Sequence, residues 1–231
     1  MFDISPTEWT AILLSLRVAV IATLVATPFG IALAWLLARR DFWGKSILDA
    51  AVHLPLVLPP VVTGYLLLLT LGKRGLVGAW LAEHLGIVFA FRWTGAALAC
   101  GVMSFPLLVR PIRLSIEAVD RRLEQAAETL GAAPWRVFAT VTLPLALPGV
   151  LAGMVLGFAK AIGEFGATIT FVSNIPGETQ TISSAIYSLI QTPDGDAAAG
   201  RLVIISVAIA MGALIAAEWF ARRATARLHG Q

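Results

Sequence analysis

The sequence predicts an all-α membrane protein, a bundle of about five transmembrane helices with six as the alternative. Of its 231 residues, 58% are hydrophobic and only 13% are charged, and the mean hydropathy is +0.84. Soluble domains are about 45–50% apolar and about 25% charged, so a soluble fold of this length could not cover so much apolar surface. Helices are expected because a chain in hydrocarbon must satisfy its backbone hydrogen bonds internally. We therefore treat residues 1–231 as a single transmembrane domain.

Five apolar segments are long enough to cross a hydrocarbon core of about 30 Å, which takes roughly 20 helical residues. They cover approximately residues 10–38, 52–71, 93–109, 145–162 and 202–220. The apolar piece at residues 76–91 carries Glu83 and His84, which favours a short helix at the membrane surface over a sixth span. The N-terminus, MFDISPTEWT, has no basic region, so we expect the first span to be an anchor and not a cleavable signal peptide.

Basic residues indicate which side of the membrane each connection faces, since Lys and Arg accumulate in cytoplasmic loops. One set of connections holds Arg39, Arg40, Lys45, Arg110, Arg113, Arg121, Arg122, Arg136, Arg222, Arg223 and Arg227. The other set holds only Lys73, Arg74, Arg92 and Arg201, and Arg17 and Lys160 fall within spans. This distribution predicts an external N-terminus and a cytoplasmic C-terminus that includes His229, as five crossings require.

A polar, alanine-rich stretch interrupts the apolar pattern between the third and fourth spans, in a connection predicted to be cytoplasmic. Asp120 is a candidate N-cap, and Glu124 and Glu128 follow where carboxylates favour the positive end of a helix dipole. Gly131 can end this helix. An apolar stripe is formed by Leu123, Ala126, Ala127 and Leu130. A helix this short is marginal alone, so we expect the stripe to dock in a groove on another protein.

Residues 125–144 resemble the EAA loop of ABC importer membrane subunits, whose pattern is E-A-A, three residues, G, nine residues, I, one residue and L-P. The matching positions are Gln125, Ala126, Ala127, Gly131, Val141, Leu143 and Pro144. Gln125 stands where the pattern has an acid, and Val141 stands where it has isoleucine. Glu124 lies one residue early, and one residue rotates a helix by about 100°, so its substitution for the missing acid stays open. A juxtamembrane helix without a partner is the alternative for this segment.

The resemblance implies a fold, a set of partners and a location. The fold is that of a type I ABC importer permease, with a coupling loop at about residues 117–144 that docks on a dimeric cytoplasmic ATPase. The chain would work as a homodimer in the plasma (inner) membrane of a bacterium or archaeon, supplied by a periplasmic or extracellular oxyanion-binding protein. The sequence has no G-x-x-x-x-G-K-[ST] phosphate loop, so ATP hydrolysis is assigned to the partner and no enzyme activity is expected. We also expect no cofactor, no metal site and no nucleic-acid binding.

Helix breakers and hydroxyl groups in the central spans are candidates for the translocation pathway, because irregular backbone at membrane depth is tolerated where it lines a cavity. They occur in HLPLVLPPVVTGYLLL, in SFP and in GEFGATIT. The candidate residues are Pro59, Pro60, Gly64, Ser104, Phe105, Glu164 and Thr168. Purely structural kinks are the alternative for the prolines. Glu164 is a functional candidate as an ionisable group at membrane depth, or else an acid that reaches interfacial water.

The runs HLPLVLPPVV and GEFGATITFVSNIPGET are similar to molybdate permeases within this family, with sulfate, tungstate and phosphate permeases as near relatives. Hydroxyl and backbone N–H groups can pass a tetrahedral oxyanion without trapping it, which is compatible with the resemblance but does not identify the anion. Two hypotheses from other classes stay open. One is a secondary transporter driven by protons through Glu164, and the other is a membrane scaffold that transports nothing.

Overall fold

The computed structural model describes residues 4–228, with side chains to residue 216 and at Trp219, and the described chain is helical without a strand. The helices are α1 (Pro6–Arg39), α2 (Lys45–Val57), α3 (Pro60–Leu71), α4 (Leu76–Leu85), α5 (Trp93–Ala118), α6 (Arg121–Thr129), α7 (Pro134–Val137), the π-helix η1 (Phe138–Thr142), α8 (Leu143–Ile162), α9 (Gly166–Val172), α10 (Ile182–Leu189) and α11 (Asp196–Leu228).

Four stretches are long and apolar enough to cross a membrane, and they contain four of the five predicted spans, the last of these except for its final residues. They are α1, α5, the continuous stretch Pro134–Ile162 and the part of α11 at Asp196–Ala216. The first span begins earlier than predicted because Ser5 caps α1: its side chain accepts from the Glu8 N–H while the Glu8 side chain accepts from the Ser5 N–H. Apolarity alone gives no sign of where such a capped helix begins.

The second predicted span, residues 52–71, is not one straight helix. It is divided between α2 and α3, whose axes differ by 114° across the break at residues 58–59. Leu58 and Pro59 each precede a proline, which disfavours the helical conformation, and both have extended ψ angles of 142° and 134°. The Pro-Pro pair therefore breaks the segment, whereas Pro28 lies inside α1 without ending it.

The segment at residues 76–91 forms a short helix, as predicted, followed by an irregular stretch. Its helix, α4, has 10 residues, which corresponds to a length of about 15 Å, roughly half of a hydrocarbon core. Within the described residues the structure therefore contains four long apolar helices, or five spans if the bent α2–α3 pair counts as one.

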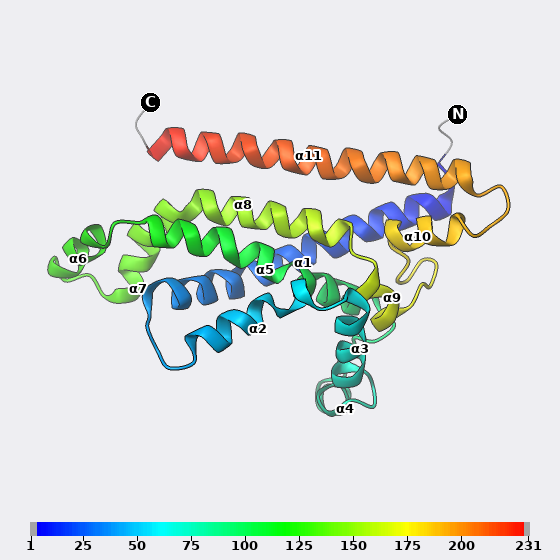
Figure 1. The fold of residues 1–231 in the computed structure, drawn as a ribbon, viewed down its shortest axis with the longest axis horizontal. Helices are drawn as coiled ribbons and strands as arrows, with labels where there is room; N and C mark the ends of the chain where they lie inside the picture. The colour runs from blue at the N-terminus through cyan, green and yellow to red at the C-terminus, as the bar shows by residue number, and fades with distance from the viewer. Residues whose placement is uncertain (1–3, 229–231) are drawn as a thin grey trace.

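The long helices lie along the long axis of the molecule, with α6 and α7 at one end and α9 and α10 at the other (Figure 1). Helix α5 packs against both α1 and α8, and α11 packs against α8. Small side chains allow this close packing, since Ala19, Ala96 and Ala99 are completely buried. Helices α3 and α4 project away from the bundle as an arm (Figure 1).

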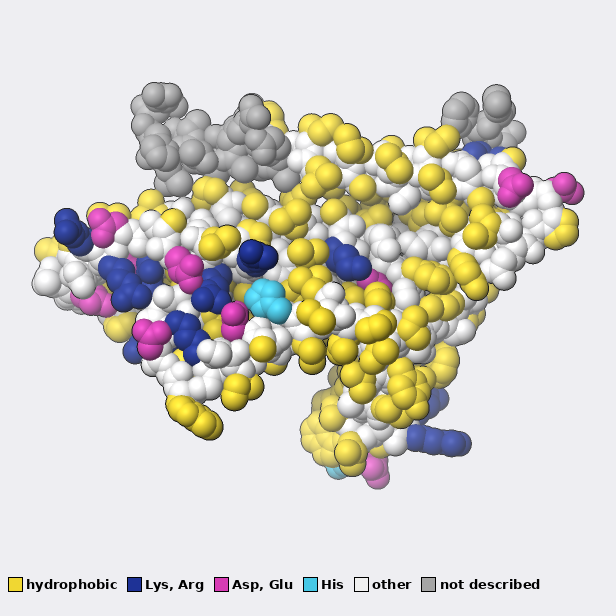
Figure 2. Space-filling view, viewed as in Figure 1, with side chains coloured by type: hydrophobic (Ala, Val, Ile, Leu, Met, Phe, Trp, Pro, Cys, Tyr) yellow, Lys and Arg dark blue, Asp and Glu magenta, His cyan; other side chains and the backbone are white. Residues whose placement is uncertain are grey.

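Charged side chains gather at the end of the molecule that carries α6 and α7, and apolar side chains cover much of the middle (Figure 2). Helix α1 begins and α11 ends at opposite ends of the bundle, as an odd number of crossings requires (Figure 1). His229 lies outside the described residues, as do the side chains of Arg222, Arg223 and Arg227.

Candidate functional site

The polar segment between α5 and α8 forms a helix, α6, most of whose residues are exposed. The Asp120 side chain accepts a hydrogen bond of 2.9 Å from the Arg122 N–H, so the predicted N-cap is confirmed. None of the residues of α6 is buried. Two apolar side chains stand out, because Leu123 is 51% exposed and Leu130 is 89% exposed. An exposed apolar surface on an otherwise polar helix is typical of a binding site for another protein.

Gly131 ends this helix as the sequence predicted. Its φ is +85°, and the following backbone folds back so that the Ala132 N–H donates to the Ala127 carbonyl at 3.1 Å. Residues with a side chain rarely adopt this conformation, which explains the glycine in physical terms.

Gly131→Ala should destabilise this turn by about 1 kcal/mol, because the left-handed conformation is unfavourable for a residue with Cβ. A Cβ at this position has nothing within 4 Å, so the effect isolates the backbone conformation from crowding. Hydrogen exchange of the α6 amides should become faster while the rest of the protein is unaffected. Gly200→Ala is the control, since its Cβ also has open space but its φ is ordinary. Unchanged exchange in Gly131→Ala would contradict the prediction.

Glu124 and Gln125 point in different directions. This bears on whether Glu124 can substitute for the acid that the family pattern has at position 125. Gln125 is exposed, whereas the Glu124 side chain is only 15% exposed and lies against α1 and η1. Arg39 Nε lies 3.0 Å from one Glu124 oxygen, and Arg39 Nη2 lies 3.1 Å from the other. Glu124 therefore does not occupy the outward position that the family pattern gives to an acid.

Two further groups complete the surroundings of Glu124. The Thr142 hydroxyl donates to Glu124 at 2.6 Å, and Arg39 also donates to the Val119 carbonyl at 3.1 Å. We call these four residues the Glu124 cluster. It joins the last turn of α1, the end of α5, the first turn of α6 and the last residue of η1.

The remaining matched positions lie where the loop returns to the bundle. Val141 belongs to the π-helix η1, and Leu143 and Pro144 form the start of α8. The π-helix ends shortly before this proline, which has no N–H with which to continue the regular α-helical hydrogen-bond pattern. A cavity of about 270 Å³ lies between this return segment, α6 and the end of α1. Its walls include Arg40, Arg121 and Glu128, so it is polar and open to a charged partner.

Several predicted pathway residues are buried within the chain itself. Ser104 is completely buried and donates to the Gly101 carbonyl at 3.2 Å, and Thr168 is buried and donates to the Phe165 carbonyl. Gly64 is buried against α9, where a Cβ would lie 2.5 Å from the Ala167 carbonyl oxygen. These three positions therefore make packing or hydrogen-bond contacts within the described chain, and their place in the pathway stays a prediction.

The two prolines of the break have a different environment. Pro59 is the N-cap of α3 and is exposed, and Pro60 is its first residue and is partly buried. They form the point where the chain turns from the bundle into the arm of α3 and α4 (Figure 1).

Glu164 is paired, and it links α8 to α9. One of its oxygens lies 2.7 Å from Lys160 Nζ, and the other accepts from the Ala167 N–H at 3.0 Å. The carboxylate therefore sits at the positive end of α9 while the cation lies in the last turn of α8, both of which are favourable helix-end positions. The contacts of Glu164 are those of a structural junction between α8 and α9, and its functional role stays a prediction.

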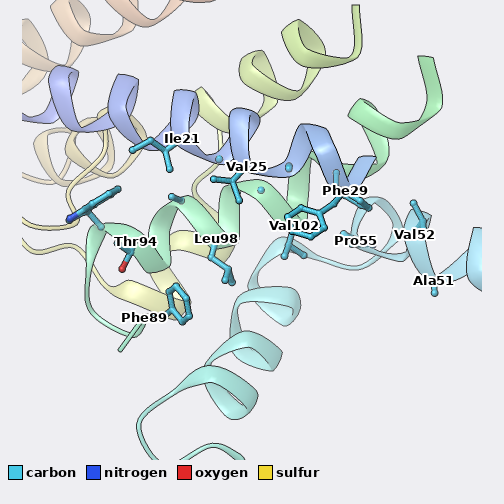
Figure 3. Close-up of a pocket in the computed structure, with 16 residues that line it drawn as sticks. Ile21, Val25, Phe29, Ala51, Val52, Pro55, Phe89, Thr94, Leu98 and Val102 are labelled. Carbon is cyan, nitrogen blue, oxygen red and sulfur yellow. The ribbon is translucent and has the colours of Figure 1, made fainter. Parts of the chain in front are cut away.

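An apolar cavity of about 700 Å³ lies between α1, α2 and α5 (Figure 3). Ile21, Val25 and Phe29 line it from α1, and Leu98 and Val102 line it from α5 (Figure 3). Of the predicted pathway residues, only Phe105 is in its wall. A wall of this kind offers an anion few hydrogen bonds, so this cavity alone is not an oxyanion site.

The sequence did not predict two sets of polar contacts at the ends of the bundle. Arg39 and Thr142 bind Glu124, and Arg201 in α11 pairs with Glu8 in α1 at 3.0 Å. The partners in the two ion pairs are 85 and 193 residues apart in the chain. No local spacing could have identified them. The available signal was the direction of Glu124, which helix geometry turns by about 100° from Leu123 and by about 160° from Ala126, away from the exposed apolar surface.

Known proteins resemble this chain along nearly its whole length. Residues 26–226 match the family described as binding-protein-dependent transport system inner membrane components. The molybdenum transport system permease protein ModB of Escherichia coli K12 is 63% identical over 215 residues, which cover 93% of this chain and 94% of that protein. The ModB protein of Haemophilus influenzae is 56% identical over 221 residues, with 96% of each chain covered.

Solved structures show the same fold at lower identity. A chain of a bacterial ABC transporter involved in the import of alginate superposes with a TM-score of 0.74 at 21% identity, covering 95% of this chain and 80% of that one. The exposed α6 loop, the apolar bundle and the family match at residues 26–226 agree with one another. The chain belongs to the family of binding-protein-dependent transport system inner membrane components, and it is an integral, multi-pass membrane subunit of an ABC importer.

Proposed function

We propose that this chain is the permease subunit of a molybdate importer and that two copies form the translocation pathway. The observation that carries the cargo assignment is the identity of 63% and 56% to two molybdenum permeases over more than nine tenths of the chain. The large cavity within the described part of the single membrane domain (residues 1–231) has apolar walls, so a pathway between two copies is favoured over one inside a single copy.

A dimeric cytoplasmic ATPase docks on α6 in this proposal. The support is the exposed surface of Leu123, Ala126 and Leu130, which lies beside the polar cavity bounded by Arg121 and Glu128. An apolar contact surrounded by charged groups combines affinity with specificity. The outward Gln125 and the turn at Gly131 lie at the two ends of the same surface.

The orientation follows from the same proposal. The end with α6 and α7 faces the cytoplasm, where the basic side chains gather, and the end with α9 and α10 faces outside (Figures 1 and 2). An external oxyanion-binding protein would deliver the cargo to the outer end. The plasma (inner) membrane of a bacterium is the location, with the N-terminus outside and the C-terminus in the cytoplasm.

The pathway is assigned to the surfaces around the α2–α3 break. Pro59 is exposed there, and Phe105 lies in the wall of the neighbouring apolar cavity. Gly64, Ser104, Glu164 and Thr168 support these surfaces from behind, because their side chains or backbone are buried in contacts within the chain. Oxyanion passage past such walls depends on hydroxyl and backbone groups that two copies contribute together.

Reconstitution tests this function directly. The chain is placed in lipid vesicles together with the ATPase of a molybdate importer from the same organism. ATP is enclosed in the vesicles with the ATPase, and the molybdate-binding protein and radiolabelled molybdate are added outside. Uptake of the label into the vesicles is then measured. We expect uptake that requires both partners and that excess unlabelled molybdate abolishes. Stronger competition by sulfate than by molybdate would reassign the cargo.

The same assay distinguishes an ABC importer from a proton-driven transporter and from a scaffold that transports nothing. A proton-driven transporter would accumulate molybdate without ATP when a proton gradient is imposed, and an uncoupler would abolish that uptake. A scaffold would give no flux under any condition. Glu164 already has two partners within the chain, Lys160 and the Ala167 N–H, which favours a structural role over the proton-driven class.

A further inference from the structure

The contacts of the Glu124 cluster connect the loop helix α6 to the ends of three long helices, α1, α5 and α8 with its preceding π-helix. Glu124 itself belongs to the loop helix α6, Arg39 to α1, and Thr142 to the π-helix that continues into α8. Val119 is the C-cap of α5 and accepts from Arg39. Four segments therefore meet at one carboxylate and one guanidinium.

The geometry of the cluster makes this junction stiff. The two Glu124 oxygens face two nitrogens of the Arg39 guanidinium at 3.0 and 3.1 Å, which is the paired arrangement that fixes both distance and orientation. Their side chains are 15% and 9% exposed, so solvent screens the pair less than it would a surface pair. The 2.6 Å hydrogen bond from Thr142 uses the remaining capacity of one oxygen.

The rest of α6 has no comparable attachment. None of its residues is buried, and Leu130 at its far end is 89% exposed. A load applied to the outer face of α6 therefore reaches the bundle through the first turn of the helix, where Glu124 lies. The π-helix on the other side of the cluster is a segment with weakened regular hydrogen bonding, which is a common place for a helix to adjust.

We propose that Glu124 is a positioning residue that transmits movement of α6 to α1, α5 and α8 and does not itself contact the ATPase. This inference rests on the proposed function, since it assigns a role in the coupling of ATP hydrolysis to transport. Two adjacent residues then have different roles. Gln125 and its exposed neighbours bind the partner, and Glu124 connects this surface to the membrane helices.

The test compares three quantities in the reconstituted transporter: ATPase binding to the permease, the rate of ATP hydrolysis, and the amount of molybdate transported per ATP. In Glu124→Gln we expect transport per ATP to fall roughly fivefold to tenfold, while binding of the ATPase is unchanged. Thr142→Val removes only the 2.6 Å hydrogen bond and should lower the ratio in the same direction by less.

Glu117→Gln is the matched control. Glu117 pairs with Arg113 at 2.8 Å near the cytoplasmic end of α5, so the change removes the same kind of ion pair, but one that lies within a single helix. Its ratio of transport to hydrolysis should equal that of the unmodified protein. In the double variant Arg39→Gln with Glu124→Gln, the ratio of transport to hydrolysis should be no lower than in the more impaired single variant. The reason is that both changes remove the same contact.

Each outcome decides the inference. An unchanged ratio in both Glu124→Gln and Thr142→Val overturns it. A loss of ATPase binding that parallels the loss of transport also overturns it, since Glu124 would then be a docking residue. If Glu124→Gln does not yield folded protein, Thr142→Val alone decides. Absence of ATP-driven uptake in the unmodified protein refutes the proposed function instead, and this distinguishes the two failures.

Discussion

Leu130→Asp should abolish binding of the ATPase while the permease remains folded. Leu130 is 89% exposed at the end of α6, so the substitution removes no contact within the chain. In the proposed complex the side chain is desolvated by the partner, and an unpaired carboxylate in that contact would carry a large desolvation cost. We expect at least a hundredfold loss of affinity, which corresponds to roughly 3 kcal/mol.

Binding of the purified permease to the ATPase in detergent measures this effect. Leu76→Asp provides a control of the same chemistry, because Leu76 is 93% exposed in α4 and lies in the arm, away from α6 (Figure 1). It should bind the ATPase normally. Equal binding by Leu130→Asp and Leu76→Asp would show that the exposed surface of α6 is not the docking site.

Gly64→Val should remove most of the folded protein, in contrast to what the sequence suggested. A pathway-lining glycine would accept a larger side chain with loss of flux only. In the structure, however, a Cβ on Gly64 lies 2.5 Å from the Ala167 carbonyl oxygen and 2.9 Å from its Cα, and both are backbone atoms that cannot rotate away. The α3–α9 contact would have to separate, at a cost of about 3 kcal/mol.

Thermal unfolding in detergent and the yield of monodisperse protein measure the loss. Gly212→Val is the control, since it makes the same change within a helix and a Cβ there has nothing within 4 Å. Its unfolding temperature should lie close to that of the unmodified protein. A Gly64→Val protein that unfolds like the control but transports nothing would restore the interpretation of Gly64 as a pathway residue.

The position of α6 and the character of its two ends followed from the sequence because they depend on local chemistry. Asp120 can cap the next turn only through its own neighbours, and Gly131 adopts a left-handed φ that few other residues tolerate. The long apolar segments were equally predictable, since a hydrocarbon core demands about 20 apolar residues wherever the helix packs. The break at the Pro-Pro pair also has a local cause. Its angle of 114° does not follow from the local sequence.

The roles of individual polar side chains depended on contacts between distant segments. The sequence presented Glu124 and Glu164 as two acids in helical regions, each with an open function. Folding brings Arg39 to Glu124 from 85 residues away, and the end of α8 sets Lys160 against Glu164. The same packing buries Ser104 and presses Gly64 against α9, contacts that no local pattern in the sequence could indicate.

The sequence by itself determined that this chain is a helical membrane protein with a polar loop helix bearing the family pattern, because composition, capping and turn chemistry act over a few residues. Only the tertiary structure decided which side chains of that loop face outward and which hold it to the bundle. The physical reason is that one residue changes the direction of a side chain on a helix by about 100°, and the surface it then meets belongs to another part of the chain. Gln125 is exposed and Glu124 is bound to Arg39 for that reason.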